Sequence, residues 1–362
     1  MSHYKLGANA FPKISGKVKD FLHQIQRLKT EGKITTDVIT MEGTAKLHGM
    51  HADIVFDISG LTQIADTTTT PQKVTFQSRN RTCPPEASQH GWPCNLAEHP
   101  ETLQDLKTRV LRRFEDHNPE VKIDYTKPLI VAGEWIGPKV QKNVGVSELS
   151  HRFVILAVQI NGSWQQDTVY ADIEAPEAAI YSVLRVPQYV VEFDTNNLSL
   201  TNPALLKMQR LADAVEEQCP FAAKFGIGNS MGEGIVWKPG VPAGRSDAKY
   251  WLKTKGPNFG PENRIKPSSG PDNFHEKILS VDSAAEKWFT PRRVEQGFEY
   301  LEEMQTSKPA RWRTFVRWIQ DDIMKEEKAD IEMMEQQTPG FTSMLQRDLG
   351  RLASEAFQEH AK

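Results

Sequence analysis

The chain has 362 residues and a formal net charge of −3 at pH 7. This length is enough for two domains and at least one large core. The near-zero charge excludes a protein that is basic throughout, so a nucleic-acid partner would have to meet a local basic surface.

The residue content also bounds the compartment. The three cysteines, an odd number, favour a reducing environment over a disulfide framework. No apolar run approaches the roughly 18 residues of a membrane span. The N-terminal "MSHYKLGANAFPKISGK" lacks an apolar stretch of signal-peptide length. We therefore expect an intracellular protein, cytoplasmic or nuclear, with no membrane partner.

The N-terminal part predicts one helix and then a strand-rich body. Apolar residues recur with helical spacing at Val18, Phe21, Leu22, Ile25 and Leu28. From about residue 36 to 255, short β-type runs separated by turns dominate: "VTFQSR", "PLIVAGEWI", "RFVILAVQI", "EGIVWKP" and "KYWLKTK". Helical stretches at 101–117 and 203–218 interrupt them. This pattern predicts an α+β domain over residues 1–258.

Two long polar insertions break this body. "SGLTQIADTTTTPQK" is typical of a mobile hairpin tip. "TCPPEASQHGWPCNLAEHP" contains four side chains able to bind zinc, namely Cys83, His90, Cys94 and His99. Their spacing lacks a Cys-x-x-Cys pair, so a disordered or nucleic-acid-contacting loop is favoured over a zinc site.

The composition changes after residue 258. Residues 259–273, rich in Gly and Pro, are the predicted linker. Residues 274–362 predict an all-helical domain, in which Thr290 before Pro291 makes a helix start. Two apolar stripes follow, one at Trp312, Phe315, Val316, Ile319 and Ile323 and one at Leu345, Leu349, Leu352 and Ala356. This domain has 13 Lys+Arg against 17 Asp+Glu, a net charge of −4.

The stretch "MEGTAKLHGMHADIVF" places Lys46 between two strand-like runs. A lysine there costs free energy unless it has partners or a function. As a nucleophile it would need nearby cations, partial burial, or a metal and a phosphate opposite it. The sequence supplies such groups in order: Arg79 and Arg81 in "FQSRNR", Glu134 in "GEWIGPKVQKNVG", Glu233 and Lys238 in "MGEGIVWKP", and Lys253 and Lys255 in "YWLKTK". Lys253 and Lys255 share one face of a strand because the side-chain period is two.

These segments resemble the ordered motifs of the covalent nucleotidyltransferases. "KLHG", with a histidine in third place, is similar to the first motif of the second RNA ligase family, which includes phage-type enzymes that seal nicks in duplex RNA and the kinetoplastid editing ligases. "GEWIGPKVQKNVG", "EGIVWKP" and "LKTK" resemble that family's third, fourth and fifth motifs. The resemblance implies a nucleotidyltransferase (ATP-grasp-like) domain of antiparallel sheets with ATP in a cleft between them, followed by helices that help to engage RNA.

The resemblance also implies roles for single residues. Lys46 would attack the α-phosphorus of ATP and carry AMP, and Lys253 and Lys255 would hold the α-phosphate. Glu134 would bind the ribose hydroxyls, and Glu233 would position Mg²⁺ or Mn²⁺. The remaining candidates are less specific: Arg79, with Arg81 as its alternative, would contact the ribose or a substrate phosphate, Lys238 would contact phosphate or be a solvated charge, and His48 belongs to the catalytic site without an assigned role.

Two positions depart from the family pattern. Leu156 stands where an aromatic residue usually packs on adenine, and Phe153 is the alternative contact from another angle. Ala45 replaces an acidic residue often seen before the lysine.

The implied reaction joins RNA 3′-hydroxyl and 5′-phosphate ends on nicked or bridged duplex, and thus RNA repair. An ATP-dependent DNA ligase, a GTP-using capping enzyme, and a nucleotide- or RNA-binding homologue without turnover remain as alternatives. For RNA backbone contact the candidates are "KTRVLRRF" (107–114) and "RWRTFVRW" (311–318). A solvated helix face explains either stretch equally well.

Overall fold

A computed structural model of the full chain describes residues 11–65, 73–79, 81–85, 91–186, 188–259 and 281–360. The chain forms two compact units, residues 1–269 and 270–362. Apart from Phe259, the predicted linker lies outside the described residues. Much of the predicted hairpin tip and part of the second insertion, including His90, also lie outside them.

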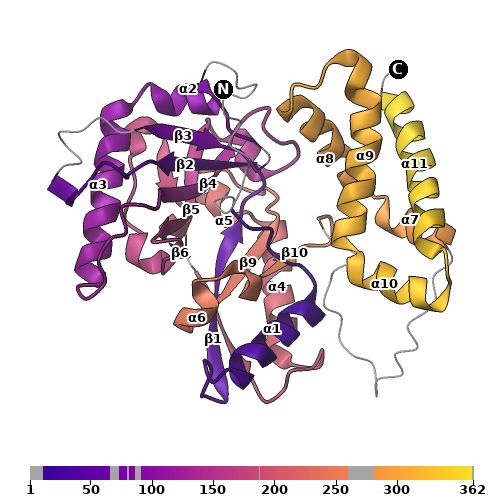
Figure 1. Cartoon of the computed structure of the whole chain (residues 1–362), viewed down its shortest axis with the longest axis horizontal. Helices are drawn as coiled ribbons and strands as arrows, with labels where there is room; N and C mark the ends of the chain where they lie inside the picture. Colours follow the sequence, from indigo (N-terminus) through magenta and orange to yellow (C-terminus); the bar gives the residue numbers. More distant parts are fainter. Residues whose placement is uncertain are drawn as a thin grey trace. The chain divides into compact units, whose positions relative to one another are not determined.

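Two sheets form the centre of the first unit (Figure 1). The four-stranded sheet has the order β10-β9-β1-β8 and is antiparallel throughout. Its strands are β1 (Val38–Lys46), β8 (Tyr189–Asp194), β9 (Gly234–Pro239) and β10 (Leu252–Lys255).

The six-stranded sheet has the order β3-β2-β4-β5-β6, and β7 pairs with β5 in parallel. Its other pairs are antiparallel. Its strands are β2 (Met50–Phe56), β3 (Val74–Gln77), β4 (Leu129–Ile136), β5 (Arg152–Ile160), β6 (Ser163–Trp164) and β7 (Ile180–Ser182).

Helices cover one face of each sheet. The helix predicted at 18–28 is α1 (Val18–Thr30), which packs with α4 (Pro203–Glu217) on apolar residues of the four-stranded sheet. On the six-stranded sheet, α2 (Trp92–Ala97) and α3 (Pro100–His117) form the largest core cluster. Short elements complete the unit: α5 (Pro220–Lys224), α6 (Pro242–Arg245) and 3₁₀ turns at Gly145–Glu148, Asp167–Tyr170, Pro176–Ala178, Val183–Arg185 and Ala248–Tyr250.

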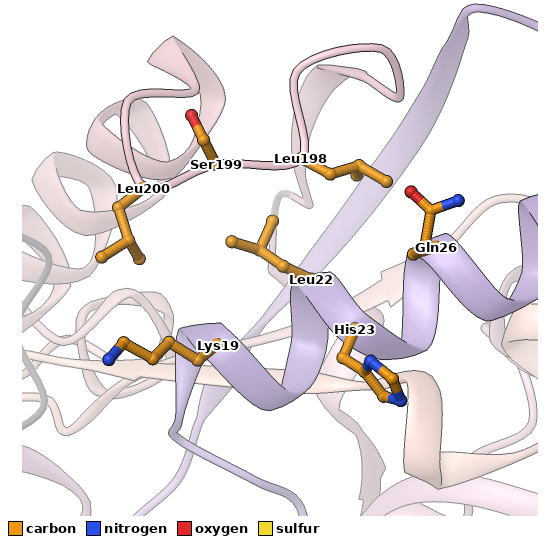
Figure 2. Close-up of a pocket in the computed structure, with 7 residues that line it drawn as sticks. All are labelled: Lys19, Leu22, His23, Gln26, Leu198, Ser199 and Leu200. Atoms are coloured by element: carbon orange, nitrogen blue, oxygen red, sulfur yellow. The ribbon is translucent and has the colours of Figure 1, made fainter. Parts of the chain in front are cut away.

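A hollow of about 320 Å³ lies between α1 and residues 198–200 (Figure 2). Leu22 and Leu198 point into it, and Lys19 and His23 lie along its helical side. None of the predicted site residues lines this hollow, so it lies apart from the candidate site.

The second unit is helical, as the sequence predicts. Its helices are α7 (Val281–Trp288), α8 (Pro291–Glu303), α9 (Lys308–Glu326), α10 (Lys328–Gln337) and α11 (Phe341–His360). The Thr290 hydroxyl accepts a hydrogen bond from the Arg293 amide at 3.2 Å and caps α8. Phe315, Ile319 and Ile323 are buried in a core with α11, whereas Trp312, predicted on the same stripe, is 43% exposed.

The predicted α+β class with antiparallel sheets and a helical C-terminal region is therefore confirmed. Among the described helices, none has both the length and the hydropathy that crossing a bilayer requires.

Candidate active site

Strand register places two lysines around one glycine. On the four-stranded sheet, Lys46 of β1 pairs with Gly234 of β9, which in turn pairs with Lys255 of β10. Because side chains alternate along a strand, Lys46, Lys253 and Lys255 lie on the face opposite to the one that α1 and α4 cover. The three strands thus bring together lysines that are about two hundred residues apart in sequence.

One carboxylate, that of Glu233, binds both Lys46 and Lys255. Glu233 Oε2 lies 2.6 Å from Lys46 Nζ and 3.2 Å from His48 Nδ1, and its Oε1 lies 2.8 Å from Lys255 Nζ. The Glu233 side chain is 3% exposed, whereas the lysine side chains are 24% and 21% exposed. The carboxylate is therefore the buried centre of the cluster, and both lysine side chains remain partly exposed.

Gly234 allows this close packing. Its φ is +149°, and a Cβ there would lie 2.1 Å from the Thr254 carbonyl oxygen. Any other residue would push β10 away from β9. Gly234 therefore keeps Lys255 close enough to share the Glu233 carboxylate with Lys46.

The ionisation of Glu233 follows from these contacts. Burial alone would raise the pKa of the carboxyl group, but the positive charges of Lys255 and Lys46 outweigh burial and hold the pKa well below its usual value. Glu233 is therefore an anion at neutral pH. Two ammonium groups on one carboxylate leave a net positive charge, which suits a phosphate ligand.

A second carboxylate comes from the six-stranded sheet. Glu134 on β4 accepts a hydrogen bond through Oε1 from the Gly49 amide, at 3.0 Å. A Cβ at Gly49 would lie 2.3 Å from the Trp135 carbonyl oxygen, so glycine permits this approach. Burial raises the pKa of Glu134, and the charges of Lys46, His51 and Arg79 partly offset the rise. Lys46 and Glu134 thus act on each other electrostatically across the two sheets.

A buried histidine–carboxylate contact adjoins Glu134 on the neighbouring strand. His51 pairs with Glu134 in the β2–β4 register, and its Nε2 lies 2.9 Å from Asp53 Oδ1. Both side chains are nearly inaccessible to solvent. The sequence reasoning missed this pair, although the alternation of polar His51 and Asp53 with apolar Ala52 and Ile54 is the available signal.

The arginine candidates lie in the turn after β3. Arg79 is exposed, and its charge acts on Glu134. Arg81 is half-buried, and its carbonyl accepts a hydrogen bond from the Ser78 amide at 2.9 Å. The electrostatic coupling favours Arg79 as the site residue, with Arg81 as the alternative.

The two candidates for the adenine contact lie on opposite faces of β5. Phe153 is 0% exposed in the core cluster with α3, so contact with a base near Glu134 does not fit its position. Leu156 is the extra residue at a register shift and packs in a separate cluster with Leu47 and Val154. Tyr181, which pairs with Val154 and packs in the same cluster, supplies an aromatic ring that the sequence reasoning missed.

The Lys238 side chain is buried and forms an ion pair with Asp167. This lysine side chain is 4% exposed, and its Nζ lies 2.6 Å from Asp167 and 4.1 Å from the centre of the Trp251 ring. Burial lowers the pKa of Lys238, and Asp167 partly offsets this shift. In this structure Lys238 therefore neutralises Asp167, so a phosphate contact would first require breaking that ion pair.

The second insertion does not gather metal ligands in the described part of the chain. Cys83 is buried in the core, Cys94 is exposed on α2, and His99 precedes α3. No group of three or more His, Cys, Asp or Glu side chains there could hold a metal ion.

Fold and site together define an α+β protein with a lysine-rich centre built on one buried carboxylate, beside a second carboxylate from a facing sheet. Residues 40–255, more than half of the chain, match the family model described as RNA ligase. The chain therefore belongs to the RNA ligase family, which confirms the predicted resemblance.

Solved structures resemble the chain only weakly. Part of the chain is similar to Naegleria gruberi RNA ligase with PPi (13% identity, TM-score 0.43, 72% of this chain and 60% of that one). It is also similar to a mutant of that enzyme with AMP and Mn (14% identity, TM-score 0.39, 69% and 57%). The chain thus spans less than two thirds of the length of these structures. No curated protein matched it.

Proposed function

We propose that the protein is an ATP-dependent RNA ligase that joins a 3′-hydroxyl to a 5′-phosphate through a lysyl-AMP intermediate. The observation that carries the proposal is the position of Lys46. It is paired with Lys255 on one buried carboxylate, inside a chain that belongs to the RNA ligase family.

Lys46 is the proposed nucleophile. After losing a proton, its Nζ attacks the α-phosphorus of ATP, a nitrogen–phosphorus bond forms, and pyrophosphate leaves with the electrons of the broken oxygen–phosphorus bond. Lys253 and Lys255 lie on the same strand face and would stabilise the charge on the equatorial oxygens. Glu233 positions both Lys46 and Lys255 before ATP arrives.

Glu134 is the proposed ribose ligand. Its Oε1 is occupied by the Gly49 amide, and the other oxygen accepts no hydrogen bond from the described residues. That oxygen is available to a ribose hydroxyl. Leu156, with Tyr181 on the same face, would pack against the base.

Glu233 also fits a divalent metal, Mg²⁺ or Mn²⁺. Carboxylate oxygens are the hard ligands that these ions prefer, and Mg²⁺ sites commonly combine one or two carboxylates with substrate phosphates. The bound ion would neutralise charge on the phosphates. Glu233 would become free to bind the ion when phosphate oxygens take over its contacts with Lys46 and Lys255.

Two transfers would complete the reaction. The AMP moves from Lys46 to the 5′-phosphate of RNA, which breaks the nitrogen–phosphorus bond and returns the amine. The 3′-hydroxyl then attacks the activated phosphate, a phosphodiester forms, and AMP leaves. Sealing of nicks in duplex RNA is the proposed physiological form of this reaction.

A joining assay tests the proposal. Purified protein is incubated with ATP, Mg²⁺ or Mn²⁺, and 5′-phosphorylated strands presented as single strands, splinted ends or nicked duplex. We expect joining of nicked RNA with ATP and none with GTP. Sealing only behind a DNA 3′-hydroxyl would instead identify a DNA ligase. Nucleotide binding without an adduct or joined product would identify a homologue without turnover.

A further inference from the structure

Asp53 is a buried carboxylate that the proposed reaction does not use. Its side chain is 1% exposed, and neither of its oxygens accepts a hydrogen bond from the described residues. The same part of the chain offers it one basic group within ion-pair distance, since His51 Nε2 lies 2.9 Å from Asp53 Oδ1. A buried carboxylate costs free energy unless hydrogen bonds or a positive charge compensate it. Because the contact is not aligned as a hydrogen bond, His51 compensates Asp53 only when its ring is protonated.

His51 lies between this carboxylate and that of Glu134. His51 and Asp53 are two positions apart on β2, so both side chains point to the same face of the six-stranded sheet. On that face His51 pairs with Glu134 of β4 in the antiparallel register, and the Cβ atoms of such pairs are about 4.5–5.5 Å apart. Phe11 packs against the imidazole, with 5.0 Å between the ring centroids. The fold thus fixes the ring between two carboxylates.

Glu134 depends on nearby positive charge to stay ionised. Burial raises the pKa of its carboxyl group, and the negative charge of Glu233 adds to the rise. Three positive charges from the end of β1, from β2 and from the turn after β3 oppose it, namely those of Lys46, His51 and Arg79. The ionisation of Glu134 therefore changes when one of these charges is lost.

The proposed reaction removes the first of these charges. Lys46 loses a proton before it attacks ATP, and the nitrogen–phosphorus bond that forms leaves its nitrogen without a positive charge. Arg79 keeps its charge, but its side chain is exposed and solvent screens its effect. Of the three groups, only His51 then places a buried positive charge beside Glu134.

From this arrangement we propose that Asp53 is a positioning residue that holds the His51 ring in its charged form. The charged ring keeps Glu134 ionised while AMP is attached to Lys46. An ionised carboxylate accepts the stronger, charge-assisted hydrogen bond from a ribose hydroxyl. Asp53 thus acts on the transfer of AMP to RNA rather than on its attachment to the protein. This inference rests on the proposed function for the roles of Lys46 and Glu134.

Single-turnover kinetics of the full-length protein separate the two steps. Asp53→Asn keeps the size of the side chain and removes its charge. We expect the rate of protein–AMP formation to change by less than about threefold. The acidic limb of the pH profile for AMP transfer from the isolated adduct to nicked RNA should move upward by about one pH unit or more, which is about a tenfold loss of rate at acidic pH. The rate should recover at higher pH, because Glu134 then ionises without the charge of His51.

Matched variants separate this role from a purely structural one. His51→Gln should give the same shifted profile, and the double variant with Asp53→Asn should shift it no further. Asp116→Asn removes an exposed carboxylate from α3 and should leave both steps unchanged. A structural role of Asp53 would instead slow both steps together and leave the midpoint of the profile where it is.

NMR of the wild-type protein with isotope-labelled histidine measures the charge of the ring directly, with its signals assigned through the His51 backbone. We expect a charged ring at pH 7, before and after AMP is attached. A neutral ring would overturn the inference even if the variants fail to fold, and so would a wild-type transfer profile in Asp53→Asn. A wild type that forms no adduct would remove the proposed function, while the NMR spectrum still decides whether Asp53 holds the ring charged.

Discussion

At the scale of single residues, Glu233 organises the candidate site. Its carboxylate contacts the side chains of Lys46, Lys255 and His48. An apolar replacement of a whole buried ion cluster is often neutral for stability, because desolvation offsets much of the attraction, whereas removal of one partner leaves the other charges unpaired and is destabilising. We therefore infer that the cluster is kept for function, with Glu233 holding the lysines in place until phosphate oxygens replace it.

Replacement of Glu233 tests this inference, because it should change the free energy of unfolding. The pKa of Glu233 lies well below its usual value, so its contribution is present above the unfolded pKa of about 4.5 and is lost as the pH falls through the folded value. We expect Glu233→Gln to lower the free energy of unfolding by about 1–3 kcal/mol at pH 7. The difference from wild type should shrink below pH 4.5.

Denaturant melts at several pH values measure this effect, with Glu192→Gln on the exposed side of β8 as the matched control. Adduct formation should fall at least tenfold in Glu233→Gln and stay unchanged in Glu192→Gln. A Glu233→Gln protein with wild-type stability and wild-type adduct formation would show that the carboxylate holds neither lysine.

Sequence periodicity predicts some residue positions and misses others. The shared face of Lys253 and Lys255 follows from the strand period alone, and the structure has it. The opposite faces of Phe153 and Leu156 also follow from it, because the two residues are three positions apart, but the period alone does not tell which of the two faces α3 covers. The Lys238–Asp167 pair joins residues 71 positions apart, a contact that no local pattern reveals.

At the scale of elements, α3 shows how burial changes a basic helix. Its apolar spacing predicts the helix, and the observed Pro100–His117 agrees with the predicted 101–117. Its charge pattern suggested an RNA-contacting face, but which cations face the sheet depends on the packing of α3 against it. Lys107 is 1% exposed, and its Nζ donates to Gln104 Oε1 at 2.9 Å.

Lys107 should make stability depend on pH. Burial lowers the pKa of Lys107 from 10.5 to about 8, so between these values the unfolded chain binds more protons than the folded one. Stability therefore rises with pH across this window, by up to about 3 kcal/mol. Lys107→Met removes the buried charge, so the variant should be more stable than wild type at pH 7 and should lack this dependence.

Unfolding by urea at pH 7, 9 and 10.5 would reveal the difference, with the exposed Lys122→Met as a control for loss of a lysine. If Lys107→Met is less stable than wild type at every pH, the amine has a stabilising partner that outweighs its desolvation.

At the scale of the whole molecule, the chain has two compact units with separate cores. All the proposed nucleotide-binding residues belong to the first unit. The Gly- and Pro-rich stretch between strand-rich and helical sequence places the expected boundary at residues 259–273, and that boundary stays a prediction. The order of the strands within each sheet, by contrast, depends on pairing between strands that are distant in sequence.

Calorimetry should therefore resolve two unfolding transitions. The Lys46→Ala variant, which cannot form an adduct, is heated with and without ATP. Ligand at about 100 times its Kd adds about 2.7 kcal/mol to the unit that binds it, so only one transition should move upward. A single transition, or an equal shift of both, would show that the two units unfold as one.

The most direct measurement locates AMP on the protein. Wild type and Lys46→Arg are incubated with ATP and Mg²⁺ or Mn²⁺, quenched with a metal chelator and denaturant, digested at mildly alkaline pH and sequenced by mass spectrometry. We expect one AMP on the wild-type peptide at Lys46 and no adduct in Lys46→Arg, which keeps the positive charge but not the nucleophile. An adduct on another residue, or no adduct in the wild type after an alkaline workup that preserves a nitrogen–phosphorus bond, would contradict the central role of Lys46.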